Sequence, residues 1–183
     1  MVDPYSNQRS NSDFWKPYKI EYNLGLLYQR SEKYETETVQ AYKRCLTYSS
    51  CSQSNNCLCH LNLGVLHEQT GIKQLREQAK KHYEKCLDEM KCKFNLARLY
   101  YQTGNFQSAV ELFLGDKSFD DKSIGDVSYG AADRASFTNL AAMSYYQLGN
   151  FTMAETLVRK SLRFNPNHQP ALKLQAIIAN RET

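Results

Sequence analysis

The chain has 183 residues, of which 42% are hydrophobic and 23% charged, and its formal net charge is +4. This composition predicts a soluble protein that is long enough to bury a continuous core. The net charge is too small to indicate nucleic-acid binding, for which a clustered basic stripe is expected. No apolar run reaches the roughly 18 residues that a membrane-spanning helix needs, so no membrane span is predicted.

The N-terminal residues predict no targeting signal. Residues 1–13 are polar and rich in Ser and Asn, which favours a flexible arm. They hold no apolar core for a secretory signal, and Asp3 and Asp13 argue against a mitochondrial presequence. Asp13 is the expected N-cap of the first helix, with Pro17 in its first turn. The sequence therefore predicts a cytoplasmic protein and leaves a nuclear or cytoskeleton-associated one open.

Residues 95–113 predict two short helices that are separated at Gly104. Apolar residues recur there at the spacing of one helix face, first at Leu96, Leu99 and Tyr100 and then at Phe106, Ala109, Val110 and Phe113. Gly104 can adopt the left-handed backbone conformation without a Cβ penalty, so it is expected to end the first helix. One such pair cannot bury its apolar face alone, so we expect neighbours of the same kind.

The neighbours appear as a repeated triplet, which is N-L-G from Asn23 and Asn62 and N-L-A from Asn95 and Asn139. An aromatic residue or a histidine follows each triplet, at Tyr28, His67, Tyr100 and Tyr145. This pattern resembles the tetratricopeptide repeat (TPR) family, whose unit is a helix-turn-helix of about 34 residues. The clearest unit is 135–168, which has the small residues, the Gly149-Asn150 turn and the Pro166 of the family.

The resemblance implies an all-α fold, namely a right-handed α-solenoid of four TPR-like helix pairs plus a C-terminal capping helix, in one domain from 14 to 183. The units are expected at about 18–51, 57–90, 90–123 and 135–168, and the capping helix at about 169–181. In the second unit, Ala79, Tyr83 and Cys86 come three residues late, and the extra residues are expected to lengthen the turn that Gly71 starts. The capping helix is expected to bury Leu172, Leu174, Ile177 and Ile178, and Trp15 to cover the other end of the array.

The third unit departs most from the pattern. Its second helix should end at Leu114, because Gly115 follows where a small packing residue belongs. Residues 115–130 then form a long polar connection, and connections of more than about 12 residues are uncommon in compact domains. We expect a tolerated insertion. A partner-contacting or regulated loop stays open, since Ser118, Ser123 and Ser128 could accept phosphate.

The six cysteines are expected to be reduced, because Cys45 and Cys86 occupy small-residue packing positions and a cytosolic protein keeps its thiols free. The cluster of Cys51, Cys57, Cys59 and His60 lacks the paired spacing of zinc sites, so no metal or other cofactor is predicted. No phosphate-binding loop, zinc-protease motif or nucleophile elbow occurs, so the chain is not expected to be an enzyme.

The candidate binding residues follow from the resemblance, since the triplet Asn lies on the first helix, which faces the concave groove in that family. An Asn amide can bond both the C=O and the N–H of an extended peptide. Lys91 and Arg98 would select the peptide that is held. The expected ladder is Asn23, Asn62, Asn95 and Asn139, and Asn139 is the least well placed because one extra residue separates it from Tyr145. The alternative is that Asn serves the array's own loops.

The family's clamp for acidic chaperone tails is not assembled. Tyr22 and Leu26 replace two of its residues in the first unit, and Asn95 replaces an Arg in the third.

We therefore expect a non-catalytic scaffold or adaptor that binds a peptide or helix of a protein partner in its concave groove, without nucleic acid. The alternative is a permanent structural subunit of a large multiprotein assembly. An RNA-binding helical repeat is a further reading that the small positive charge leaves open.

Overall fold

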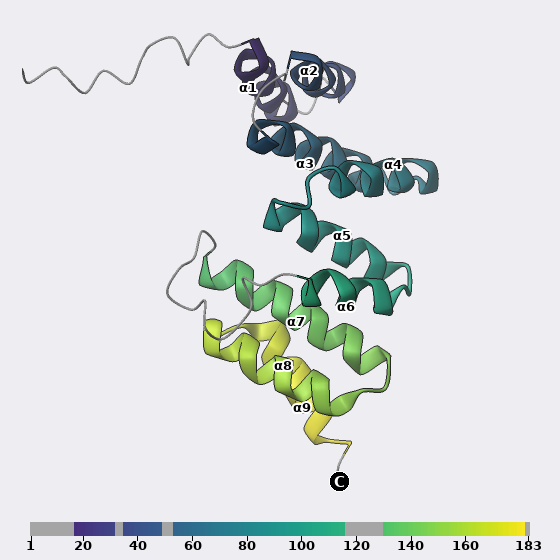
Figure 1. Cartoon of the computed structure of the whole chain (residues 1–183), viewed down its shortest axis with the longest axis vertical. Coiled ribbons are helices and arrows are strands. Elements are labelled where there is room, and N and C mark those ends of the chain that lie inside the picture. Colours follow the sequence, from purple (N-terminus) through teal and green to yellow (C-terminus); the bar gives the residue numbers. More distant parts are fainter. Residues whose placement is uncertain (1–16, 32–34, 49–52, 116–129, 182–183) are drawn as a thin grey trace, which may run out of the picture. The chain divides into compact units, whose positions relative to one another are not determined.

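The computed structural model describes residues 17–31, 35–48, 53–115 and 130–181. All regular secondary structure in these ranges is helical, which confirms the all-α fold (Figure 1). The predictions for residues 1–13, Asp13, Trp15 and residues 116–129 lie outside the described ranges. The helices are α1 (Pro17–Arg30), α2 (Glu35–Tyr48), α3 (Gln53–Gln69), α4 (Lys73–Glu84), α5 (Met90–Gln102), α6 (Phe106–Leu114), α7 (Ala131–Gln147), α8 (Phe151–Phe164) and α9 (Gln169–Ala179).

The chain divides into two compact units. Unit 1 is Met1–Glu89 and contains the helix pairs α1–α2 and α3–α4. Unit 2 is Met90–Thr183 and contains the pairs α5–α6 and α7–α8 followed by α9. The described helices are thus the four expected pairs and a closing helix, and α6 ends at Leu114 as predicted. The single domain from 14 to 183 stays a prediction.

The two helix pairs of unit 1 each pack a glycine against a tyrosine. A Cβ atom on Gly25 would lie under 3.0 Å from the ring of Tyr42, and one on Gly64 would lie under 3.0 Å from the ring of Tyr83. Both rings are fully buried. The Tyr42 hydroxyl donates to Gln29 Oε1 at 2.9 Å, and burial raises the pKa of Tyr42 to about 12. Glycine is therefore required here for close approach of the helices rather than for flexibility.

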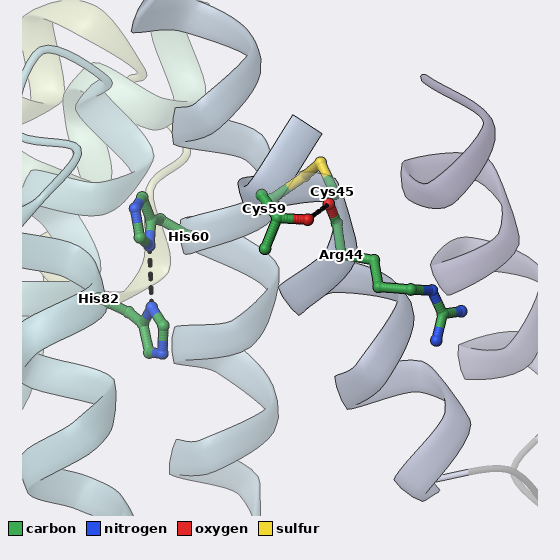
Figure 2. The surroundings of a disulfide bond; sticks show 6 residues. Arg44, Cys45, Cys59, His60 and His82 are labelled. Carbon is green, nitrogen blue, oxygen red and sulfur yellow. Dashed lines mark hydrogen bonds between the residues drawn. A yellow bond between two sulfur atoms is a disulfide. The ribbon is translucent and has the colours of Figure 1, made fainter. Parts of the chain in front are cut away.

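A disulfide links the two helix pairs of unit 1 (Figure 2). Cys45 of α2 and Cys59 of α3 face each other with their Cα atoms 6.6 Å apart, within the usual range for disulfides. Both are fully buried beside Tyr18 and Leu63. The expectation that the cysteines are all reduced is therefore wrong. The small-residue position of Cys45 on α2 packs against Cys59 of α3 at the seam, and the two cysteines can bond there.

The extra residues of the second unit lengthen α4 rather than the turn before it. Residues 70–72 separate α3 from α4, as three residues separate α7 from α8 at 148–150. Ala79 is the seventh residue of α4, whereas the equivalent Ala154 is the fourth residue of α8. The predicted longer turn is wrong. Three residues added at the start of a helix make almost one full helical turn, so the apolar residues that follow still face the same neighbour.

The core of unit 2 surrounds α7. Phe137 is fully buried and makes edge-on ring contacts with Phe94 of α5 and Phe113 of α6, at centroid distances of 6.1 and 5.6 Å. The Ser161 hydroxyl of α8 donates to the Ala135 carbonyl at 2.8 Å, so the small residue of α8 also fixes its distance from α7. These contacts bury most of one side of α7.

Both turns of unit 2 within a helix pair use a left-handed glycine. Gly104 and Gly149 have φ angles of 79° and 78°, which confirms the role predicted for Gly104. The next residue in each turn, Asn105 or Asn150, donates its backbone N–H five residues back, at 2.8 and 2.9 Å. This is the hydrogen bond of a Schellman helix end.

Helix α9 buries only part of its predicted apolar side. Leu174 and Ile178 are buried against unit 2, whereas Leu172 is 37% and Ile177 50% exposed. The four residues span too wide an arc of one helix to face a single neighbour. None of the helices in the described ranges is long and apolar enough to cross a membrane.

Candidate functional site

Three helices of unit 2, α5, α7 and α9, line a groove made of two adjoining hollows. The first hollow is about 360 Å³ and is lined by Phe94, Arg98, Tyr101, Gln102, Ser136, Asn139, Leu140, Met143, His168 and Pro170. The second is about 280 Å³ and is lined by Tyr101, Met143, Tyr146, Gln147, Pro170, Lys173, Leu174 and Ile177. We call the two together the α5–α7–α9 groove. The hollows share Tyr101, Met143 and Pro170, which form the ridge between them.

Helical spacing places these side chains on one stripe of each helix. On α5 the stripe is Phe94, Arg98 and Tyr101, at intervals of four and three residues. On α7 it is Ser136, Asn139, Met143 and Tyr146. Residues three and four apart lie on the same helix face, so each helix offers one continuous edge to the groove.

Asn139 is a polar group of the groove, and its acceptor atom is buried without a hydrogen-bond partner. Its side chain is 3% exposed, and its Nδ2 group donates to Met143 Sδ at 3.5 Å. Its Oδ1 atom is buried and accepts no hydrogen bond. Leaving a buried acceptor unpaired costs about 1–3 kcal/mol. Such a residue is poorly explained by folding alone.

The charged residues that line the two hollows are cationic. Within the described residues these are Arg98 in the first hollow and Lys173 in the second, and no carboxylate lines either. Burial lowers the pKa of His168, so that its imidazole is neutral near pH 7. A smaller hollow next to the groove holds Lys91 opposite Asp133, together with Met90, Phe94 and Ser136.

The predicted binding residues fall in different places. Asn139 and Arg98 line the first hollow, and Lys91 lies in the smaller one beside it. Asn95 is half-buried and lines none of these hollows. In unit 1, Asn23 is exposed on α1, and Asn62 hydrogen-bonds to the side chain of Tyr42. A ladder of all four asparagines stays a prediction.

The one-residue offset of Asn139 explains its place. One residue turns a helix by about 100°, so the additional residue between Asn139 and Tyr145 moves Asn139 to the stripe that Phe94 occupies on α5. The offset was expected to turn Asn139 away from the other asparagines, and Asn139 lies on the stripe of Phe94 rather than that of Asn95, where it lines the first hollow. The apolar lining by Phe94, Tyr101 and Met143 was missed, although the three-and-four spacing on each helix is visible in the sequence.

A second cluster of titratable groups lies in unit 1, between α3 and α4. His60 Nδ1 and His82 Nδ1 are 2.9 Å apart, and His67 stacks on His82 at a centroid distance of 5.5 Å (Figure 2 shows the first pair). Burial lowers the pKa of all three histidines, and that of His82 falls to about 4. In the ranges that the structure covers, no three or more His, Cys, Asp or Glu side chains are grouped to hold a metal ion.

Comparison with known proteins identifies the repeats. Two family models described as tetratricopeptide repeat match residues 92–115 and 135–168. The chain is a TPR protein. The second match coincides with α7 and α8, and the first covers α5 and α6. Both matched repeats therefore lie in unit 2, where they supply two of the three helices of the groove.

Solved structures share the fold of this TPR protein at low sequence identity. The PilF structure from Pseudomonas aeruginosa is 19% identical, with a TM-score of 0.67 over 91% of this chain and 69% of that one. The MamA structure is 16% identical, with a TM-score of 0.65 over 90% of this chain and 82% of that one. YrrB, described as a TPR protein with an unusual peptide-binding site, is 14% identical. Its TM-score is 0.62 over 88% of this chain and 75% of that one. No curated protein matches the sequence.

The tetratricopeptide repeats support a role in protein interaction.

Proposed function

We propose that this TPR protein is a non-catalytic scaffold that holds a segment of a partner protein in the α5–α7–α9 groove. The observation that carries the proposal is an apolar groove with the unpaired Oδ1 atom of Asn139 buried at its lining. Binding sites for peptides and small ligands combine an apolar lining with a few polar groups that fix orientation. The groove has this composition.

The lining can supply useful affinity. Burying one large apolar side chain contributes about 1.5–3 kcal/mol. The two hollows can hold two such side chains of the bound segment. Ordering the segment offsets part of this gain. Met143 lies on the ridge between the hollows, and its flexible thioether side chain can adapt to the shape of the segment. We expect weak binding, with a dissociation constant no tighter than about 100 µM for a short segment.

The groove is poorly equipped for catalysis. Its lining serine, Ser136, donates its hydroxyl hydrogen bond to the Ala132 carbonyl at 2.9 Å, within its own helix. A nucleophilic serine would instead be oriented by a base. The proposed role therefore uses binding alone.

The second candidate is a permanent subunit of a large assembly. Large apolar side chains that do not line the groove are exposed, with Leu27 at 63%, Leu114 at 61% and Ile72 at 51%. Single exposed apolar residues are common, but a permanent interface would cover them. In that case these residues, and not the groove, would carry the contact.

Site-specific crosslinking in the native cell tests the proposal. A photoreactive amino acid replaces Tyr101 on the ridge of the groove. In a matched protein it replaces Thr156, which is exposed on α8, and in a third protein it replaces Leu114. We expect the Tyr101 position to form an adduct that maps to one short segment of one partner, and the Thr156 position to form none. Equal adducts at both positions, or adducts at Leu114 alone, would overturn groove binding in favour of the permanent subunit.

A further inference from the structure

We propose that the segment held in the α5–α7–α9 groove is extended and acidic, with two large apolar side chains separated by one residue. This inference rests on the proposed function and adds the conformation and the chemistry of the bound segment. Three features of the groove carry it: the adjoining hollows, the buried amide of Asn139 and the sign of the charges at the lining.

The adjoining hollows favour alternate apolar side chains. The two hollows meet at Tyr101, Met143 and Pro170, so both can be filled by neighbouring parts of one segment. In an extended chain, side chains at positions i and i+2 point to the same side and are about 6.6–6.8 Å apart. One apolar side chain would contact Phe94 and Leu140, and the next would contact Leu174 and Ile177.

The amide of Asn139 favours an extended backbone over a helical one. Its Oδ1 atom needs a donor. The backbone N–H groups in the interior of a helix are already bonded to carbonyls four residues earlier. An extended segment has free backbone N–H groups, and one of them can bond to Oδ1. The Met143 side chain, whose sulfur contacts Nδ2, would shift to admit it.

The charge of the lining selects the flanking residues. Arg98 and Lys173 are the charged side chains of the two hollows in the described part of the chain, and each lies beside one hollow. Carboxylates on either side of the apolar pair would meet these cations, whereas lysines there would be repelled. The segment that fits the groove therefore has five positions, which are in order acidic, apolar, any residue, apolar and acidic.

Three synthetic peptides and the full chain test this inference. The first peptide is Gly-Asp-Phe-Ser-Phe-Asp-Gly, and the second is Gly-Phe-Asp-Ser-Phe-Asp-Gly, which has the same composition with the aromatic residues three apart. In the third, Gly-Lys-Phe-Ser-Phe-Lys-Gly, lysines replace the acids. Each carries a fluorescent label, and fluorescence anisotropy measures its affinity. We expect the first to bind, the second to bind about threefold more weakly and the third not to bind.

Three protein variants assign the binding to the groove. Asn139→Leu is expected to weaken the first peptide about tenfold through loss of the acceptor. Its melting temperature should be unchanged or higher, because an apolar side chain replaces an unpaired amide. Arg98→Gln is expected to weaken binding about threefold, and less at high salt. The control Arg159→Gln removes an exposed cation of α8 and should leave the affinity unchanged.

The outcomes separate this inference from the proposed function. Equal binding of all three peptides, or equal binding by Asn139→Leu and the unchanged chain, would overturn it. If no peptide binds while the Tyr101 crosslink maps to a partner segment, the inferred chemistry is wrong and groove binding stands. If no peptide binds and the crosslink is absent, both are wrong.

Discussion

Gly64 and Tyr83 make one of the closest contacts in unit 1, because a Cβ atom on Gly64 would meet the buried ring at under 3.0 Å. Gly64→Ala should gain about 1 kcal/mol of helix propensity. Displacing the buried Tyr83 ring should cost more free energy than this gain, so we expect a net loss of roughly 1–3 kcal/mol in the free energy of unfolding. Urea unfolding measures this change. In a Tyr83→Leu background the same substitution should be less harmful, and an equal loss in both backgrounds would contradict the contact.

The three histidines of unit 1 predict a loss of stability in acid. The pKa of His82 is lowered to about 4 by burial and then by the positive charges of neighbouring groups, which are His60, His67, Lys85 and Lys43. The unfolded chain therefore binds protons that the folded chain does not. The stabilisation is complete above the unperturbed pKa of 6.5 and is lost as the pH falls toward about 4.

We expect this loss to be roughly 1–2 kcal/mol, allowing for the partial exposure of His82. Urea unfolding at pH 7 and at pH 4.5 measures it. Carboxylates also titrate over this range, so His82→Gln serves as the control and should show a smaller difference between the two pH values. The same pH dependence in both proteins would rule out the histidine cluster as the cause.

At the scale of elements, the Cys45–Cys59 disulfide joins α2 to α3 and so links the two helix pairs of unit 1. Closing a loop of this length in the unfolded chain stabilises the folded state by about 2–4 kcal/mol. Cys59→Ala should lower the free energy of unfolding by about this amount. Non-reducing peptide mapping of the unchanged chain should recover a peptide that contains both cysteines. Two separate peptides with alkylated thiols would contradict the bond.

The elements differ in how far the sequence could predict them. The glycine turns were predictable because Gly104 has one physical advantage, a left-handed backbone, which needs no knowledge of its neighbours. The extra residues of α4 were predicted to lie in the turn before it. A longer helix and a longer turn both place Ala79 the same number of residues later in the sequence, so the sequence does not distinguish them. The exposure of Leu172 and Ile177 depends on which neighbours α9 has, and a helical pattern alone cannot specify these.

The candidate site was only partly predictable for a similar reason. Arg98 and Asn139 were found from residue type and position in the repeat, and both line the groove. The aromatic and methionine lining was missed, because an apolar stripe at helical spacing serves a core and a binding groove equally well. Deciding between the two requires the positions of α7 and α9 around α5.

At the scale of the whole molecule, the two units differ in what they offer. In unit 1, the Gly–Tyr contacts, the disulfide and the histidine cluster fix one helix against another. In unit 2, the matched TPR repeats and α9 leave an apolar groove with the unpaired amide oxygen of Asn139 at its lining. The proposed division is that unit 2 binds the partner segment and unit 1 does not.

Covalent footprinting of the complex purified from the native cell tests this division most directly. A carbene reagent labels exposed side chains in the isolated chain and in the complex, and mass spectrometry compares the two. The account predicts protection of Tyr101, Tyr146 and Ile177 in the complex, with Leu27 and Leu114 labelled equally in both. Protection of Leu27 and Leu114 with an unchanged groove would contradict it.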